Sequence, residues 1–354
     1  MLGLGPGLAA LKQMPTGDRW LAARRTVLAI GCVAVGFSVV ACTTSPRVLS
    51  RSTHIALVPV AGQAPRDLVP YAGLGTWVDV FDYAPSYTGG KPSIVPSDVG
   101  GMAEHGIQTL FLQAARWDDQ SPGGLVNREL LRRFLIEAHD RGIRVVGWYL
   151  PNFGDLERDL ARLRQVRDFE ASGHRFDGIA IDIEYTEAVP DTDERNARLV
   201  ELSRRLRSES PDTPIAAIVP PAVQLEVVNP QYWPQFPYRE LADLYDVWMP
   251  MAYWSFRSAP YDDGYSYVYE SVVRLRSNLD RPDALVAPIG GIADAIADEH
   301  IAQFVDALVD TGAIGGSLYD WNTTPPGRQH LLHLAFTEGR ARSLPSPPDW
   351  PNAR

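Results

Sequence analysis

FDGIAIDIEY, residues 176–185, has the pattern of a buried β-strand whose two faces differ. The run is mostly apolar and is opened by Asp177 and Gly178, and successive side chains of a strand point to opposite faces. One face therefore carries isoleucines, and the other carries a small residue and two acids: Ile179, Ile181 and Ile183 against Ala180, Asp182 and Glu184. Two carboxylates that alternate with isoleucines predict a strand that ends in a polar cleft.

Asp182 and Glu184 stand at the carboxyl end of this strand, where parallel sheets and barrels place their active sites. Two residues of strand separate their Cβ atoms by about 7 Å. In a partly desolvated cleft, one charge at that distance raises the pKa of the other group, which leaves one carboxyl available as an acid near neutral pH. The alternative is a structural pair that arginines hold or that caps the next helix.

Eight apolar, β-rich runs alternate with amphipathic helical runs between residues 73 and 339. The predicted strands are residues 75–83, 107–114, 144–150, 178–185, 214–220, 245–254, 284–290 and 315–321, and the predicted helices include residues 127–142, 155–173, 193–209, 267–279 and 298–312. Several helices are expected to end at a glycine, namely Gly142, Gly173 and Gly312. This order predicts an α/β fold, a single-domain (β/α)8 TIM barrel over residues 73–339. A doubly wound open sheet is the alternative, although no glycine-rich phosphate loop favours it.

Residues 1–41 have the pattern of an export signal. Arg24 and Arg25 precede an apolar run over residues 27–41, which is too short to span a bilayer comfortably. The run ends VVAC, which resembles a bacterial lipoprotein signal that is cleaved before Cys42 and lipidated on its thiol. The sequence therefore predicts an extracytoplasmic protein that is lipid-anchored to the bacterial cell membrane. An ordinary signal peptide or an uncleaved anchor is the alternative.

Two further segments flank the predicted barrel. Residues 42–72 predict a tether, and residues 340–354 predict an irregular, proline-rich tail. The two cysteines are Cys32, inside the signal, and Cys42, so the predicted mature chain has no disulfide and no cysteine metal site.

The charge of the chain is acidic once the signal is removed. The formal net charge is −10 for the whole sequence, and residues 1–41 carry a net +3, which leaves −13 for the predicted mature chain. An acidic domain repels nucleic acid and anionic headgroups, so we expect no nucleic-acid partner and a neutral substrate.

Carboxylates and aromatic rings gather at the predicted strand ends. Pyranose faces stack on aromatic rings, and acids bind hydroxyl groups or act on the glycosidic oxygen, so this mixture predicts a site for a polysaccharide or oligosaccharide. The candidate substrate-binding residues are Asp79, Asp82, Gln113, Arg116, Trp148, Trp254, Asp320 and Trp321.

Motifs for metal, phosphate and serine chemistry are missing from the sequence. The seven histidines form no HExxH, the paired glycines mark turns, and no GxSxG is present. We therefore expect a site with no metal and no cofactor.

Three segments resemble the family 18 glycoside hydrolases, the chitinases and their relatives. DGIAIDIEY resembles the family's D-G-x-D-x-D-x-E strand, with Ala180 in place of the first acid of the inner triplet. MAYW, residues 251–254, resembles M-x-Y-D with Trp254 in place of the acid, and GGSLYDW, residues 315–321, resembles G-G-x-x-x-W with Asp320 in the Trp position. The matching residues of the first two segments are Asp177, Gly178, Asp182, Glu184, Tyr185 and Tyr253.

The resemblance implies roles for three residues. Glu184 would be the general acid that protonates the leaving oxygen, and Asp182 would orient the substrate's own 2-acetamido group, which attacks the anomeric carbon. Tyr253 would hydrogen-bond that acetamido group. If the mechanism is not substrate-assisted, the second carboxylate should come from another strand, and the candidates are Asp79, Asp82 and Asp320.

Two functions follow from these predictions. The first is a glycoside hydrolase-like lipoprotein that cleaves a polysaccharide, with Glu184 as general acid/base and Asp182 assisting. The alternative is a catalytically inactive carbohydrate-binding lipoprotein. Retention of both acids favours the enzyme, whereas Ala180 and Trp254 favour the binding protein.

Overall fold

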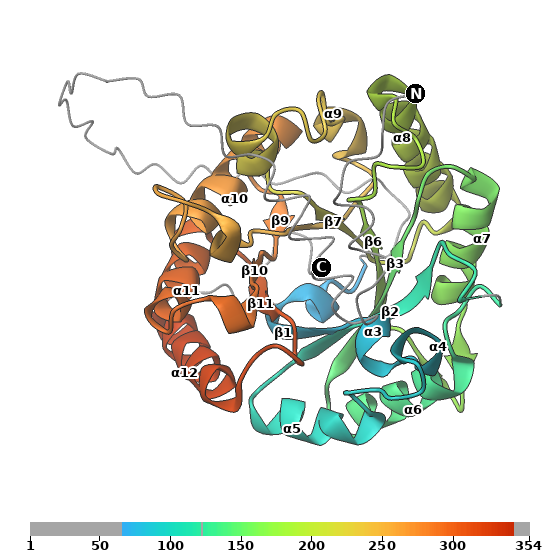
Figure 1. The fold of residues 1–354 in the computed structure, drawn as a ribbon, viewed down its shortest axis with the longest axis horizontal. Coiled ribbons are helices and arrows are strands. Elements are labelled where there is room, and N and C mark those ends of the chain that lie inside the picture. Colours follow the sequence, from blue (N-terminus) through green and yellow to red (C-terminus); the bar gives the residue numbers. More distant parts are fainter. Residues whose placement is uncertain (1–65, 122, 343–354) are drawn as a thin grey trace, which may run out of the picture.

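The computed structural model describes residues 66–121 and 123–342 (Figure 1). The predicted signal at residues 1–41, Cys42, the tether up to residue 65 and the tail from residue 343 lie outside the described residues.

A closed ring of parallel strands forms the centre of the fold (Figure 1). The ring contains β1 Gly73–Val78, β2 Thr109–Arg116, β3 Arg144–Leu150, β6 Gly178–Asp182, β7 Ile215–Val219, β8 Val247–Pro250, β9 Leu285–Val286, β10 Ile289–Gly291 and β11 Gly315–Tyr319. Their order is β10-β11-β1-β2-β3-β6-β7-β8-β9, and a parallel bridge between Met251 and Ile289 closes the ring. Because β9 and β10 are two halves of one interrupted strand, the ring has eight strand positions. The predicted (β/α)8 barrel is confirmed, and the open sheet is excluded.

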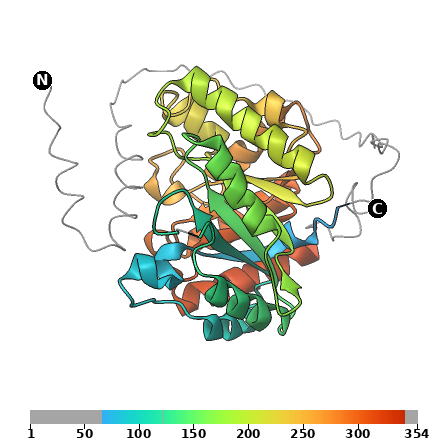
Figure 2. The ribbon, with the colours of Figure 1, turned by 90° about the vertical axis from the view of Figure 1, so that its right-hand side faces the viewer.

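Helices cover the outside of the ring, as the side view of α7 and α8 shows (Figure 2). The α-helices are α3 Val80–Tyr83, α4 Pro85–Thr88, α5 Val99–Glu104, α6 Arg128–His139, α7 Leu156–Arg167, α8 Thr192–Glu209, α9 Tyr238–Leu241, α10 Ser266–Leu279, α11 Glu299–Thr311 and α12 Pro326–Arg342. Short turns of other helix types are η1 Val69–Tyr71, η2 Pro96–Asp98, η3 Gln224–Val228, η4 Trp254–Phe256 and η5 Ala293–Ala295. None of the helices within the described part of the chain is both long and apolar enough to cross a membrane.

Side-chain caps explain where three of the long helices begin. The side chains of Asn127, Asp155 and Asp191 each accept a hydrogen bond from the backbone N–H three residues later, at 3.0, 3.1 and 2.8 Å. These bonds satisfy amide groups that have no partner inside the first turn of a helix.

The helix end predicted at residue 173 is wrong. The helix predicted for residues 155–173 ends at Arg167, and the strands β4 Glu170–Ala171 and β5 His174–Arg175 form a small hairpin after it. Gly173, with φ of 78°, lies between those two strands and does not end the helix. Gly312, with φ of 61°, ends α11 as predicted.

The end of the first strand also differs from the prediction for residues 75–83. β1 stops at Val78, because Asp79 caps the short helix α3. A cap residue leaves the strand ladder so that its side chain can accept from the helix.

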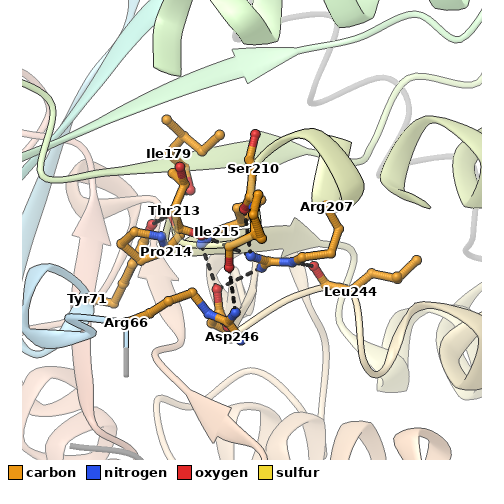
Figure 3. A network of polar contacts seen from close by, with 11 residues as sticks. Arg66, Tyr71, Ile179, Arg207, Ser210, Thr213, Pro214, Ile215, Leu244 and Asp246 are labelled. Atoms are coloured by element: carbon orange, nitrogen blue, oxygen red, sulfur yellow. Dashed lines mark hydrogen bonds and ion pairs between the residues drawn. The ribbon is translucent and has the colours of Figure 1, made fainter. Parts of the chain in front are cut away.

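An ion-pair network lies at the amino ends of β7 and β8, the end of the barrel opposite to the carboxyl ends of the strands (Figure 3). Asp246 accepts from Arg66 Nε on one oxygen and from Arg207 Nη2 on the other, both at 2.7 Å. The second oxygen also accepts from the Ile215 backbone N–H at 2.9 Å. This carboxylate therefore joins the segment before β1 to α8 and to the start of β7.

Tyr71 attaches the same segment to the barrel (Figure 3). It is 1% exposed, and its hydroxyl lies 2.8 Å from the carbonyl oxygens of both Ile179 and Pro214. The prediction that the tether extends to residue 72 is therefore wrong for residues 66–72, which pack on the barrel. The hydrogen-bond partners of Arg66 and Tyr71 lie more than 100 residues away in the sequence, so local composition could not indicate them.

Candidate functional site

The strand β6 has the alternation that its sequence predicts. Ile179, Ile181 and Ile183 pack in the layer between the sheet and the helices, whereas Ala180 packs inside the barrel. Asp182 is the last residue of β6, is 2% exposed and shares the inward face with Ala180.

Glu184 follows two residues after the end of β6 and is half-buried. The hydroxyl of Tyr232, from the loop after β7, donates to the Glu184 backbone oxygen at 2.8 Å and so fixes this part of the chain. The ring of Tyr185, the next residue, lies 5.1 Å from that of Trp117. One ring of this aromatic pair therefore belongs to the residue that directly follows the predicted acid in the chain. Sequence reasoning missed Trp117, although it follows the end of a predicted strand.

Three buried carboxyl groups meet where the first and last strands end. Asp79 follows β1, Asp82 lies in α3 and Asp320 follows β11, and each offers an oxygen within 4.8 Å of the others. Their exposed fractions are 3%, 5% and 4%. Burial, and then the charges of Asp79 and Asp320, hold the pKa of Asp82 well above its ordinary value. We call these three residues the acidic cluster.

Hydrogen bonds hold the acidic cluster in place. Asp79 accepts from the Phe81 backbone N–H at 2.7 Å and from the Tyr319 hydroxyl at 2.5 Å. Asp82 accepts from the Asp79 backbone N–H at 3.2 Å and from Asn322 Nδ2 at 2.9 Å. Sequence reasoning missed Tyr319 and Asn322, because both act on residues 240 positions earlier in the chain.

The acidic cluster is the group of described residues that could together hold a metal ion. Carboxylate oxygens are the ligands that hard divalent cations prefer. The sequence predicted no metal. A bound cation is one way to offset the negative charge of three close carboxylates, and a proton retained on Asp82, whose pKa is raised, is another.

Gln113 and Arg116, both predicted to bind substrate, have different surroundings. Gln113 is 1% exposed. Its Oε1 accepts a hydrogen bond at 3.1 Å from the backbone N–H of Val80, the residue that follows Asp79 of the acidic cluster. Arg116 donates to Asp118 at 2.8 Å, and its guanidinium carbon lies 5.1 Å from the centre of the Phe81 ring. Gln113 therefore belongs to the site, whereas the Arg116 contacts attach β2 to α3.

Large aromatic side chains form the floor of the site inside the barrel. Trp148 is 2% exposed, donates to the Phe111 carbonyl at 3.3 Å and lies 5.9 Å from Trp77, ring centre to ring centre. Tyr253, which is 4% exposed, lies 5.9 Å from Tyr319. Trp148 and Tyr253 therefore face the interior of the barrel, and the substrate-binding role of Trp148 and the catalytic role of Tyr253 stay predictions.

The predicted substrate contacts of Trp254 and Trp321 are wrong. Trp254 is 1% exposed, donates to His300 at 3.1 Å and packs 5.6 Å from the Phe304 ring on α11. Trp321 packs outside the barrel, 5.9 Å from the His105 ring. Trp254 follows the inward-facing Tyr253, and a shift of one residue moves a side chain to the opposite face. Trp321 lies beyond Tyr319, the last residue of β11, where the alternation of the strand no longer holds.

A hollow of about 720 Å³ lies on the outer surface between α7 and α8, away from the candidate site. Two ion pairs line it, Glu157 with Arg205 at 2.6 Å and Glu194 with Arg198 at 2.8 Å. We do not assign a site there, because its charged groups pair with each other and it lies away from the strand ends.

Comparison with known proteins shows the fold. No family model matches this chain, and no curated protein matches it. Among solved structures, an endo-1,4-beta-mannanase from Rhizomucor miehei aligns with a TM-score of 0.59 at 11% identity, over 79% of this chain and 99% of that one.

Two further structures match at similar levels. A GH18 chitinase mutant from Cycas revoluta, in complex with (GlcNAc)4, aligns with a TM-score of 0.55 at 10% identity, over 76% of this chain and 99% of that one. A chitinase-like agglutinin from Robinia pseudoacacia aligns with a TM-score of 0.50 at 14% identity, over 74% and 99%. The chain therefore has the TIM-barrel fold of chitinases and chitinase-like proteins.

The buried position of Asp82 predicts how stability depends on pH. A carboxyl whose pKa is raised on folding favours the protonated form, so its contribution to stability is complete below about pH 4 and is lost as pH rises towards the folded pKa. Replacement by an uncharged amide, Asp82→Asn, should reduce this loss. In urea unfolding between pH 4 and pH 8, we expect the variant to lose less stability than the wild type as the pH rises.

Asp98→Asn is the matched control for this measurement. Asp98 accepts from the Val95 backbone N–H three residues earlier, as Asp82 accepts from that of Asp79, but its bond is exposed to solvent. Equal pH dependence in wild type and Asp82→Asn would contradict the electrostatic account of the acidic cluster.

Proposed function

We propose that this protein is a glycoside hydrolase that cleaves the glycosidic bonds of a polysaccharide, with Glu184 as general acid/base and Asp182 assisting. The observation that carries the proposal is the end of β6, where the inward-facing Asp182 and the following Glu184 stand at the carboxyl end of a TIM-barrel strand. Active sites of this fold are built at that end. The solved structures that share the fold include chitinases and a mannanase, which supports the same class of reaction.

General acid catalysis requires that the Glu184 carboxyl be protonated when the substrate binds. As general acid, its carboxyl protonates the glycosidic oxygen while the bond to the anomeric carbon breaks, and as general base it later accepts a proton from the attacking water. Its half-buried position suits a group that must meet both substrate and water.

The group that stabilises the anomeric carbon has two candidates. In a substrate-assisted reaction, the acetamido group of the substrate attacks, Asp182 orients it and Tyr253 hydrogen-bonds it. In a reaction with two enzyme carboxylates, the second comes from the acidic cluster on the opposite side of the barrel mouth. Ala180, which stands where family 18 has an acid, favours the second arrangement.

A catalytically inactive carbohydrate-binding protein is the second candidate function. Two observations favour it: Ala180 adds no carboxylate to the interior, and Trp254, in the position of another family acid, packs outside the barrel. The chitinase-like agglutinin among the structural matches has the same fold.

We further propose that the protein is exported and held at the cell membrane by a lipid on Cys42. The proposal rests on the sequence of the first 42 residues, which places an apolar run and a terminal cysteine after two arginines.

Replacement of Glu184 by Gln tests the enzymatic function. The amide keeps the size of the side chain but cannot donate the proton, so we expect hydrolysis to fall about 10²–10⁴-fold while oligosaccharide affinity is retained. The substrates are chito-oligosaccharides, peptidoglycan fragments and neutral glucans, and the full-length protein is assayed by release of reducing ends. Glu201→Gln, on the exposed face of α8, is the control and should retain full activity. Oligosaccharide binding without hydrolysis by the wild type would instead establish the binding protein.

Replacement of Cys42 by Ala tests the anchor. Without the thiol no lipid can be attached, so we expect the protein to move from the membrane fraction to the soluble extracytoplasmic fraction. Cys32→Ala removes the other cysteine and should leave the distribution unchanged. Membrane retention of a Cys42 variant from which residues 1–41 have been cleaved would reject lipidation at this residue.

A further inference from the structure

Gln113 lies on the inward face of β2, next to the acidic cluster. Its neighbours Leu110 and Leu112 pack outside the barrel, whereas Phe111 packs inside, so the alternation directs Gln113 inward. Its partner in the β2–β3 register, Trp148, also packs inside. The carboxamide therefore stands inside the barrel level with Trp148, and one inward position beyond Phe111 on the same strand.

The amide nitrogen of Gln113 has no hydrogen-bond partner among the described residues. The carboxamide orientation is fixed, because Oε1 accepts from the Val80 N–H at 3.1 Å, and a rotated amide would place two donors against each other. The residue is 1% exposed, so bulk water does not satisfy Nε2. A buried donor of this kind indicates a bound group that accepts a hydrogen bond.

The neighbouring acidic cluster supplies the complementary acceptors. Asp79 is adjacent to Val80, to which the Gln113 carboxamide is bonded, and its oxygens lie within 4.8 Å of those of Asp82 and Asp320. A ligand that fits here must donate to carboxylates and accept from an amide within a short distance. Hydroxyl groups do both, and two neighbouring hydroxyls of a sugar ring present such donors and acceptors side by side.

We propose that Gln113 and the acidic cluster form a subsite for a sugar ring with two adjacent free hydroxyl groups, and that the glycan is therefore a neutral, non-acetylated one. This inference rests on the proposed function and specifies its substrate class. An N-acetylated ring replaces one hydroxyl by an acetamido group, which still donates through its N–H and accepts through its carbonyl but also carries a methyl. That methyl would lie among the carboxylates and desolvate them. A metal ion would use the carboxylates but would leave the Gln113 donor unsatisfied.

Calorimetric titration of the full-length Glu184→Gln protein tests the subsite without turnover. The ligands are neutral manno- and gluco-oligosaccharides, with chito-oligosaccharides of equal length for comparison. We expect the neutral ligands to bind more tightly, and Gln113→Met in the same background to weaken their binding about tenfold, the effect of one lost hydrogen bond.

Gln108→Met is the matched control, because Gln108 Oε1 accepts from the Leu74 backbone N–H at the other end of β2. It should leave affinity unchanged, and melting temperatures show whether each variant is folded. If Gln113→Met is unfolded, Gln113→Glu, which keeps an acceptor for Val80 but lacks the amide donor, should show the same loss.

Four outcomes would overturn the subsite. They are unchanged affinity in folded Gln113 variants, tighter binding of chito-oligosaccharides, no binding of neutral oligosaccharides, and a rise in melting temperature with CaCl2 that Asp82→Asn abolishes. The proposed enzymatic function fails separately, when the wild type binds neutral oligosaccharides through Gln113 but does not cleave them.

Discussion

Successive side chains of a β-strand must point to opposite faces, and the closed barrel turns this constraint into a division of roles. In β6, the isoleucines fill the layer under the helices, and the same backbone directs Ala180 and Asp182 to the interior. Neighbouring strands follow the same rule, so Trp77, Phe111 and Trp148 form the floor on which the polar groups stand. The candidate site is the continuation of these inward faces past the strand ends.

The amino ends of the strands carry stabilising contacts, whereas the carboxyl ends carry the candidate site. At the amino ends, Asp246 and Tyr71 use ion pairs and backbone acceptors to hold the segment before β1 in place. At the carboxyl ends, carboxylates are buried close together, an arrangement that costs stability when the groups are ionised. A structure that is stabilised at one end can retain an unfavourable cluster of charges at the other, as TIM barrels with functional carboxyl ends do.

The sequence predicted the barrel well because its signals are local. The alternation of apolar β-rich runs with amphipathic helical runs identified all eight strand positions, and the period of two within residues 176–185 identified the inward position of Asp182. The failures have two physical causes. Trp254 stands one residue after the inward-facing Tyr253, where a single step reverses the face, and Trp321 stands beyond the end of β11, where strand alternation no longer predicts a direction. Contacts between Asp79 and Tyr319, or between Arg66 and Asp246, join distant parts of the chain and leave no local pattern.

The central claim is that a glycan binds across the carboxyl ends of the strands, between Glu184 and the acidic cluster. A crystal structure of the Glu184→Gln variant, soaked with a neutral oligosaccharide, tests it most directly. The account predicts a glycosidic oxygen within hydrogen-bond distance of residue 184, with sugar hydroxyls on Gln113 and the acidic cluster. A glycan bound on the outer surface, such as the hollow between α7 and α8, with the barrel mouth free of sugar, would contradict it.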